Sequence, residues 1–252
     1  PLIGAALTIP STLVAQIIAE ECSVDFVMID MEHAPLSAEM ATYLVHATTA
    51  ASARTGRYCH TLIRVPSAGL EWIKWALDSG ASGIIIPMIN NVNDMEAVID
   101  RALYPPKGRR SFGPTMAAFS QPAGSGGVMG YFDRARNGHT AILPMIESRE
   151  GVENLEKIMA VEGVSGVFVG PFDLRLALGL PGALDGDEPT FQQALEKACA
   201  AAKHEGKIVG SMGIGVDASA KRTKEGMSFL VAVADYAVIA PGISAAISDS
   251  RA

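Results

Sequence analysis

The segment Phe26–His33 has the sequence FVMIDMEH, an unbroken apolar run that ends in an aspartate and is followed by a glutamate and a histidine. A continuous apolar run of this length is typical of a parallel strand covered on both faces. Seven further runs of the same character are spread along the chain. The expected strands are Leu2–Leu7, Phe26–Asp30, Thr61–Val65, Gly83–Pro87, Ala141–Glu147, Gly166–Val169, Lys207–Ser211 and Phe229–Val233.

Amphipathic segments lie between these strands and have the apolar spacing of helices. Ser11, Ser37 and Ser148 stand where a side chain can cap a first helical turn. The expected helices are Ser11–Glu21, Ser37–Thr49, Leu70–Asp78, Val92–Leu103, Ser148–Ala160, Thr190–Glu205 and Ala218–Gly226, with a short helix at Gly127–Asn137 inside the long segment 104–139.

Eight strands that alternate with helices indicate an α/β protein with a (β/α)8 TIM barrel. The chain has 252 residues, and single barrels commonly have about 250, so we expect one domain over residues 1–252. A doubly wound open sheet is the alternative, because periodicity alone does not prove closure. The Gly-x-Gly-x-x-Gly motif of a dinucleotide site does not follow the first expected strand, which argues against that alternative.

Composition excludes several classes of protein. Lys and Arg total 20 against 27 Asp and Glu, a net charge of −7, and a nucleic-acid binder needs clustered basic residues. Cys22, Cys59 and Cys199 are too few and too widely spaced for a disulfide framework or a zinc site. The most apolar window, residues 229–247, is interrupted by Asp235 and Pro241. We therefore expect a soluble, cytoplasmic protein with neither a nucleic-acid nor a membrane partner.

Charged side chains follow several of the expected strands. Asp30, with Glu32 and His33 just beyond it, ends the second strand; Arg64 lies near the end of the third; Glu147 ends the fifth; and Asp173 follows the sixth. The carboxyl ends of barrel strands meet at one mouth, where catalytic groups are placed. Each residue alone has an ordinary structural explanation, such as a helix cap. Together, two carboxylates with a His and an Arg predict an oxygen-ligand site for Mg²⁺ or Mn²⁺.

Five segments of the chain resemble the metal-dependent class II pyruvate aldolases. This is the family of hydroxy-oxo-heptanedioate and dehydro-deoxy-glucarate aldolases, with some resemblance to its member macrophomate synthase. The similarity covers nearly the whole chain, in order and at the family's spacing. The segments are FVMIDMEHAP at Phe26–Pro35, LDSGASGIIIP at Leu77–Pro87, YPPKGRRSFG at Tyr104–Gly113, IESREGVENL at Ile146–Leu155 and VEGVSGVFVGPFDLRLALG at Val161–Gly179.

The resemblance implies a role for each matching residue. Glu147 and Asp173 would ligate the metal, with Mg²⁺ expected first and Mn²⁺ or Co²⁺ as alternatives. Arg64 would hold the keto oxygen of pyruvate or its enolate. His33 would act as general base, with Asp30 as its orienting partner.

The resemblance also implies supporting roles. Asp78 matches an acidic residue that supports this network, although an ordinary helix-terminal charge would explain it as well. Backbone N–H groups around Phe172 and Asp173 would receive the substrate carboxylate. Phe112 and Tyr131, within segment 104–139, resemble the positions that contact the acceptor ring in macrophomate synthase; pinning of the loop is an equal alternative for both.

Three residues depart from the family pattern. Met145 stands where many members have a glutamine, Phe172 where they have an alanine, and Arg175 where they have a small polar residue. We expect these changes to alter the carboxylate pocket and the choice of acceptor more than the metal site.

The expected function is a divalent-metal-dependent carbon–carbon lyase that forms or cleaves 4-hydroxy-2-oxo acids through a pyruvate enolate, with a 2-oxo acid and an aldehyde as its small-molecule partners. The alternative within the family is an oxaloacetate decarboxylase of the macrophomate-synthase type, which captures the enolate with another acceptor. A citrate-lyase-like enzyme for a CoA thioester should show more basic residues than Arg109 and Arg110. A decayed barrel that only binds is the non-enzyme alternative.

The segment Tyr236–Ala246 is rich in Ala, Val and Ile. A last helix of this composition can pack on a neighbouring subunit. The family exchanges its final helix between protomers, so the resemblance implies a homo-oligomer, a hexamer built as a trimer of dimers.

Overall fold

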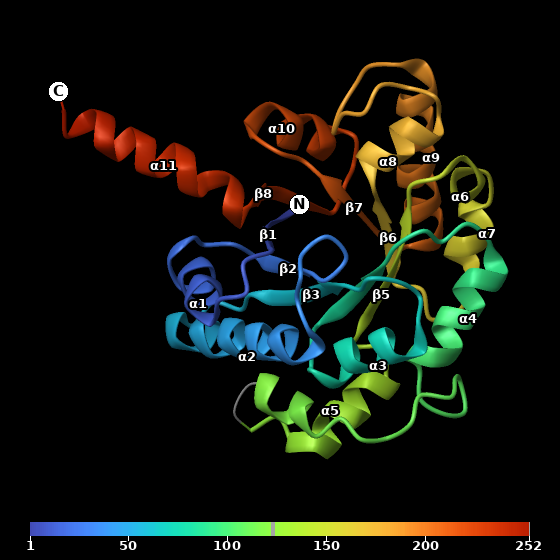
Figure 1. Ribbon diagram of the computed structural model, residues 1–252. Coiled ribbons are helices and arrows are strands. Elements are labelled where there is room, and N and C mark those ends of the chain that lie inside the picture. Colours follow the sequence, from blue (N-terminus) through green and yellow to red (C-terminus); the bar gives the residue numbers. More distant parts are fainter. Residues whose placement is uncertain (122–123, 252) are drawn as a thin grey trace.

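The structure, a computed structural model, describes residues 1–121 and 124–251. Parallel strands pair in chain order from β1 to β8, and β8 pairs with β1 to close a barrel (Figure 1). The predicted (β/α)8 barrel is confirmed. The strands are β1 (Leu2–Leu7), β2 (Phe26–Asp30), β3 (His60–Arg64), β4 (Gly83–Ile86), β5 (Ala141–Ile146), β6 (Gly166–Val169), β7 (Ile208–Met212) and β8 (Phe229–Ala234).

Helices surround the barrel, and the predicted serine caps are present. Ser11, Ser37 and Ser148 each accept a hydrogen bond from a backbone N–H in the first turn of the helix that follows. The helices are α1 (Thr12–Glu21), α2 (Ala38–Thr55), α3 (Leu70–Asp78), α4 (Val92–Ala102), the 3-10 helix η1 (Met116–Ser120), α5 (Gly127–Arg136), α6 (Arg149–Glu153), α7 (Leu155–Ala160), α8 (Pro171–Ala177), α9 (Pro189–Glu205), α10 (Val216–Lys224) and α11 (Asp235–Asp249).

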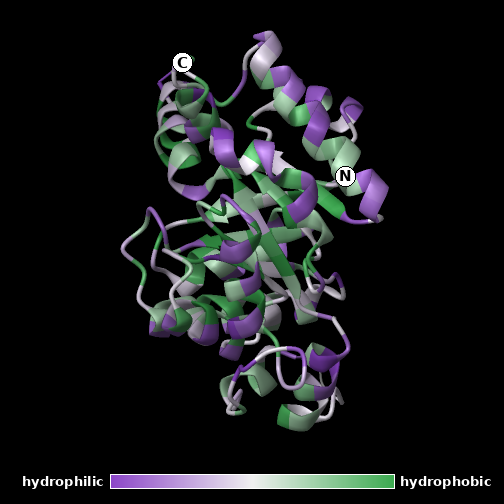
Figure 2. Cartoon of the chain, turned by 90° about the vertical axis from the view of Figure 1, so that its right-hand side faces the viewer, coloured by the Kyte–Doolittle hydropathy of each residue, from purple (hydrophilic) through white to green (hydrophobic). Residues whose placement is uncertain are grey.

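Apolar side chains form two separate layers because strand residues alternate between the two faces of the barrel wall. One layer lies between strands and helices, and the other fills the barrel interior. The rings of Phe26, Phe168 and Phe229 pack together in that interior. Figure 2 shows the hydrophobic strands at the centre and hydrophilic residues along the outer helices. The filled interior separates the two ends of the barrel.

The structure differs from the sequence prediction at several helices. Helix α2, expected to end at Thr49, continues to Thr55. The single helix expected at Ser148–Ala160 is divided at Asn154 into α6 and α7. Segment 104–139 contains η1 as well as α5. Helix α8 was not predicted; it has seven residues and begins at Pro171, where the fixed φ of proline suits a first helical position.

Helix α11 extends away from the barrel (Figure 1). Asp235 fixes its start, because its carboxylate accepts hydrogen bonds from the Thr8 hydroxyl at 2.6 Å and the Ile9 backbone N–H at 2.9 Å. Beyond Asp235 the helix exposes a series of large apolar side chains, Tyr236, Val238, Ile239, Ile243 and Ile247. Within the described ranges, none of the helices combines the length and the apolar content needed to cross a lipid bilayer.

Candidate active site

An ion pair joins the ends of β2 and β3. Asp30 and Arg64 are register partners in the parallel ladder, so both side chains leave the sheet at the same level. Arg64 donates from Nε to one Asp30 oxygen at 2.9 Å and from Nη2 to the other at 2.6 Å. Burial would lower the pKa of Arg64, but Asp30 and the nearby charges of Glu32 and Glu147 raise it overall. The guanidinium is therefore permanently charged and held in one orientation.

Asp30 also shapes the turn that follows β2. Its carboxylate accepts hydrogen bonds from the backbone N–H groups of Glu32 at 3.1 Å and His33 at 3.3 Å. The sequence predicted that Asp30 would orient the His33 ring. In the structure Asp30 contacts only the His33 backbone, because both of its oxygens are turned to Arg64.

Glu32 is the acid next to the His33 ring, and sequence reasoning gave it no role. Its Oε2 lies 3.6 Å from His33 Nε2 and 3.4 Å from Arg64 Nη1. That oxygen is buried and accepts no hydrogen bond from the described residues. Burial raises the pKa of Glu32, and Asp30 and Asp173 raise it further, against the charges of Arg64 and His33. The sequence feature that could have identified Glu32 as a site residue is its position directly before His33.

Glu147 lies at the end of β5 and is only 5% exposed. Its Oε1 accepts the backbone N–H of Met88 at 2.8 Å. Burial raises the pKa of Glu147 to about 7, and the charges of Glu32 and Asp173 contribute to the rise while Met88 and Arg64 oppose it. A Cβ on Gly170 would lie 2.6 Å from Glu147 Oε2, so any larger residue there would displace this carboxylate.

Asp173 is exposed in the first turn of α8, directly after β6. Its charge acts on both Glu147 and Glu32, which shows that the three acids share one mouth of the barrel. The structure thus brings together the predicted set of Asp30, Arg64, Glu147 and Asp173. The His33 ring lies at the rim of this cluster with 62% of its side chain exposed.

The donor set fits a hard divalent cation. Carboxylate oxygens are the ligands that such ions prefer, and Mg²⁺ sites commonly use one or two of them. The charges of Glu32 and Asp173 raise the pKa of Glu147 despite Arg64, so a cation among these acids would relieve their repulsion. The buried Glu32 Oε2 accepts no hydrogen bond from the described residues. Residues 1–121 and 124–251 contain no cluster of three or more His, Cys, Asp or Glu side chains arranged as a full metal cage. A site with two protein ligands, Glu147 and Asp173, agrees with both observations.

Asp78 and Tyr131 do not join this cluster. Asp78 ends α3, just before β4 begins, and therefore lies at the amino end of the barrel. Arg110 donates to Asp78 at 2.6 Å and to the Tyr131 hydroxyl at 3.2 Å, and Tyr131 donates to the Leu77 carbonyl at 2.7 Å. Within this chain Asp78 has the structural role of a paired helix-terminal charge, because a helix that follows a barrel strand runs back to the opposite end.

Phe112 also lies at the opposite end of the barrel from Glu147 and Asp173. It is 56% exposed and packs edge-on against Phe132, with ring centroids 5.2 Å apart. Segment 104–139 connects α4 to β5, so it lies at the amino end and not at the mouth. The predicted contact of Phe112 and Tyr131 with an acceptor is not made within this chain.

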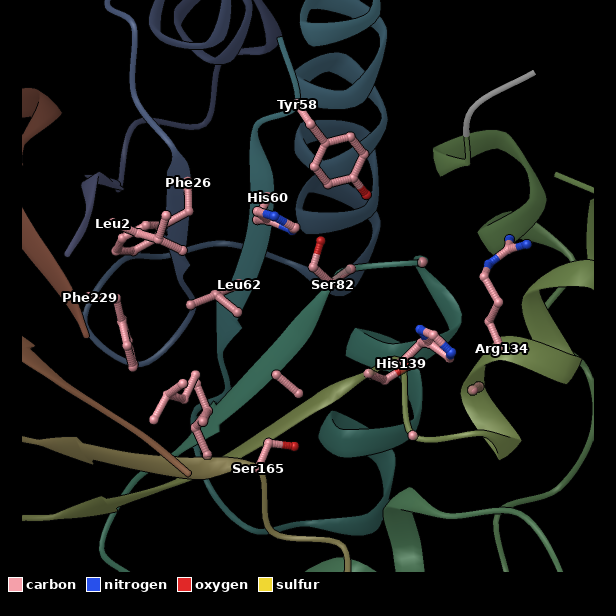
Figure 3. Close-up of a pocket in the computed structure, with 18 of the residues that line it drawn as sticks. Leu2, Phe26, Tyr58, His60, Leu62, Ser82, Arg134, His139, Ser165 and Phe229 are labelled. Carbon is pink, nitrogen blue, oxygen red and sulfur yellow. The ribbon is translucent and has the colours of Figure 1, made fainter. Parts of the chain in front are cut away.

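A cavity of about 600 Å³ opens at the amino end of the barrel. Leu2, Phe26, His60, Ser82 and Phe229 line it from the starts of their strands or just before them, with Arg134 and His139 on the α5 side (Figure 3). Its walls are mainly apolar, and it contains none of Asp30, Arg64, Glu147 or Asp173.

A family model described as HpcH/HpaI aldolase/citrate lyase matches residues 11–239. The chain belongs to this family. It is 33% identical to a hydroxypyruvate/pyruvate aldolase of Rhizorhabdus wittichii over 257 residues, which covers 100% of this chain and 95% of the relative. The predicted aldolase-type lyase is thereby confirmed.

Solved members of the HpcH/HpaI family have the same fold. A family protein from Burkholderia cenocepacia is 28% identical, with a TM-score of 0.85 over 100% of this chain and 95% of that one. Macrophomate synthase is 30% identical, with a TM-score of 0.84 over 99% of this chain and 84% of its own.

One of the three departures from the family pattern, Arg175, turns away from the mouth. Arg175 binds both oxygens of Glu188, at 2.5 and 2.7 Å, and lies over the Phe191 ring. It therefore does not enter the carboxylate pocket as expected from the sequence. Met145 is 1% exposed inside the barrel. A Cβ on Gly170 would lie 3.3 Å from its sulfur and 2.6 Å from Glu147 Oε2, so Met145 lies beneath the acidic cluster. Phe172 is 46% exposed beside Asp173 and is the departure that is exposed at the mouth.

Proposed function

We propose that this protein is a divalent-metal-dependent aldolase that forms or cleaves 4-hydroxy-2-oxo acids through the enolate of pyruvate. The observation that carries the proposal is the cluster at the barrel mouth, where Arg64, fixed by two hydrogen bonds to Asp30, lies near enough to the buried Glu147 for their charges to interact. The aldolases among the relatives support it. A divalent cation held by Glu147 and Asp173 would act as a Lewis acid on the keto acid.

Arg64 supplies the fixed positive charge of the reaction. Its Nη1 makes only a 3.4 Å ion-pair contact with Glu32, so it has donor capacity for a substrate oxygen. When the methyl group of pyruvate loses a proton, negative charge develops on the keto oxygen. A guanidinium already oriented by Asp30 stabilises that charge without reorganising.

His33 is the group we assign to the proton transfer. Histidine exchanges protons near neutral pH, and this ring is exposed at the rim of the cluster next to Glu32. It would take the proton from the methyl carbon, directly or through water, and return one to the aldehyde oxygen as the new hydroxyl group forms. Backbone N–H groups at Phe172 and Asp173, in the first turn of α8, would receive the substrate carboxylate.

Removal and return of the metal tests the proposal. The protein should cleave a 4-hydroxy-2-oxo acid to pyruvate and an aldehyde, lose this activity after treatment with EDTA, and regain it with Mg²⁺, Mn²⁺ or Co²⁺. Pyruvate release is measured with a coupled dehydrogenase. Cleavage that continues at full rate in metal-free protein would contradict the proposed chemistry.

Oxaloacetate decarboxylation is the second candidate, because macrophomate synthase is a structural neighbour and the same mouth could stabilise the enolate that decarboxylation produces. The aromatic residues expected to favour it, Phe112 and Tyr131, lie at the other end of the barrel. We therefore expect CO₂ release from oxaloacetate to be slower than retro-aldol cleavage. The opposite ratio, measured on the same metal-loaded preparation, would favour the decarboxylase.

The exposed apolar face of α11 supports the proposal of a homo-oligomer in which this helix packs on a neighbouring subunit. Light scattering of the full chain should give a multiple of 26.4 kDa, and a trimer of dimers predicts six times that mass. We also propose that the protein works in the cytoplasm, where the free cysteines Cys22, Cys59 and Cys199 stay reduced.

A further inference from the structure

Phe172 is an exposed aromatic ring at the mouth of the barrel. It is the second residue of α8, directly before the predicted metal ligand Asp173, and 46% of it is exposed. The ring packs against Gly182 in the segment between α8 and α9, where an added Cβ would lie 2.6 Å from the ring. Phe172 is therefore supported from behind by this segment and open on its other side.

The supporting segment, residues 178–188, is held at several points. Arg175, 3% exposed, binds the Pro181 carbonyl at 3.0 Å as well as Glu188. Lys221 of α10 binds Asp187 at 2.6 Å, and Arg222 of α10 binds Asp185 at 2.5 Å. These contacts fix the surface against which the Phe172 ring rests.

Two further exposed side chains at the mouth are apolar. Met88, whose backbone N–H binds Glu147, is 54% exposed, and Ile214, between β7 and α10, is 41% exposed. The segments between strands β1 to β7 and the helices that follow them (residues 8–11, 31–37, 65–69, 87–91, 147–148, 170, 213–215) contain no Lys or Arg. Arg64 is already paired with Asp30 and Glu32. Arg149, exposed in the first turn of α6, donates to the Leu178 carbonyl at 3.4 Å, at the opposite end of α8 from Phe172.

This arrangement disfavours an acceptor with a second negative charge. A carboxylate next to Phe172 would lose hydration against the ring, while Arg64 is already paired with acids and Arg149 contacts the other end of α8, so its burial is costly. An apolar body would instead displace water from the ring and gain burial.

We propose that Phe172 determines specificity and selects uncharged aldehydes with an apolar body as acceptors; this inference rests on the proposed function. In the condensation, the methyl carbon of pyruvate gives up a proton and bonds to the aldehyde carbon. The aldehyde oxygen takes up a proton and becomes the C4 hydroxyl, so no oxidant or reductant is needed. The product is a 4-hydroxy-2-oxo acid with an apolar substituent on C4.

Competing acceptors test the inference in the Mg²⁺-loaded full chain with pyruvate as donor. The ratio of kcat/KM for butanal to kcat/KM for succinic semialdehyde should exceed about 10 in the wild type, and Phe172→Ala should lower it about tenfold, a typical effect of one apolar contact. Phe172→Leu should retain part of the preference. The matched control is Phe119→Ala, which removes a ring that is 72% exposed in η1 and should keep the wild-type ratio.

Exchange of the pyruvate methyl protons in D₂O separates the possible failures, because it needs no acceptor. No exchange by the metal-loaded wild type would overturn the proposed function and this inference with it. Exchange together with a ratio that Phe172→Ala leaves unchanged, or with a wild-type preference for succinic semialdehyde, would overturn this inference alone.

Discussion

Each end of the barrel contains an arginine–aspartate ion pair with the same nitrogen–oxygen distance, but the surroundings of the two pairs differ. Arg64 lies 2.6 Å from Asp30 at the carboxyl end, and Arg110 lies 2.6 Å from Asp78 at the amino end. Further acids, Glu32 and Glu147, act on Arg64. The rings of Tyr104 and Tyr131 stand over Arg110, 4.5 and 5.7 Å from its guanidinium carbon. An arginine open to a mouth can bind a substrate oxygen, whereas one enclosed by rings stabilises the fold.

Cavity volume does not identify the candidate active site in this molecule. The cavity of about 600 Å³ is at the amino end, with mainly apolar walls. The mouth contains one fixed cation, Arg64, together with Glu32 and Glu147, whose pKa values are raised, and Asp173, whose charge contributes to both rises. Perturbed groups at the carboxyl ends of strands are a better guide to barrel chemistry than volume.

Removal of Arg64 should have the largest effect on catalysis. Arg64→Ala deletes the fixed donor to the developing oxyanion, so kcat/KM for retro-aldol cleavage should fall about a thousandfold. Arg64→Lys keeps the charge but loses the two-point contact with Asp30 and should recover only part of the rate. Steady-state kinetics and circular dichroism measure the two variants. An Arg64→Ala protein with an unchanged kcat/KM would remove the role assigned to this residue.

Removal of Arg110 should instead affect stability. Arg110→Ala breaks a largely buried pair and leaves the Asp78 carboxylate and the Tyr131 hydroxyl without this donor, so the free energy of unfolding should drop by about 3–5 kcal/mol. Arg109→Ala is the matched control, because the neighbouring Arg109–Asp100 pair is exposed and such pairs contribute about 0–1 kcal/mol. Urea denaturation gives both values. An equal loss of unfolding free energy in the two variants would show that the Arg110–Asp78 pair stabilises the fold no more than the exposed Arg109–Asp100 pair.

Glu147 should give the metal-free protein a characteristic pH dependence. Its pKa is raised from 4.5 to about 7 in the folded state, so the folded protein binds the proton more tightly than the unfolded chain. The free energy of unfolding should therefore decrease as the pH rises from about 4.5 to about 7, by about 2–3 kcal/mol. Glu147→Gln should lack this decrease. An identical pH profile in both proteins, by urea titration, would contradict the assigned environment of Glu147.

Lower pH should also weaken metal binding, because a ligand carboxyl must lose its proton first. Mn²⁺ affinity, measured by calorimetry, should fall about tenfold for each pH unit below 7. An affinity that stays constant between pH 5 and pH 7 would argue against Glu147 as a ligand.

The smallest effect is expected from Gly170→Ala. The new Cβ would lie 2.6 Å from Glu147 Oε2, so the carboxylate must shift by a few tenths of an ångström or more. We expect about a tenfold loss of kcat/KM, together with weaker Mn²⁺ binding. Gly113→Ala, where an added Cβ meets nothing within 4 Å, is the control. Equal activity of the two variants would show that Glu147 tolerates displacement.

Sequence reasoning predicted the barrel well because its strands are nearly continuous apolar runs. The bounds of β1, β2 and β6 agree with the prediction residue for residue. It could not predict the division at Asn154, since both α6 and α7 keep the same apolar period. Sequence reasoning identified Asp30, Arg64, Glu147 and Asp173 as site residues from their positions at the ends of predicted strands. All parallel strands of a barrel end at the same mouth, so these side chains lie at one end of the molecule.

The sequence could not predict which charged side chains pair with one another. Asp30 could pair with the His33 ring or with Arg64, and only the register of β2 and β3 decides for Arg64. Arg175 could enter the pocket or turn outward, and Glu188 thirteen residues later holds it outside. Asp78 and Tyr131 lie before β4 and β5, so within this chain they are at the amino end, and the roles that the family match implies for them stay predictions.

Proton exchange at the methyl group of pyruvate tests the central claim most directly, because it depends on the mouth cluster and on no acceptor. In D₂O, the Mg²⁺-loaded protein should replace the methyl protons of pyruvate with deuterium, as followed by proton NMR. The exchange should stop with EDTA and fall about a thousandfold in Arg64→Ala. Exchange that persists without metal, or that Arg64→Ala leaves unchanged, would contradict an enolate held at this mouth.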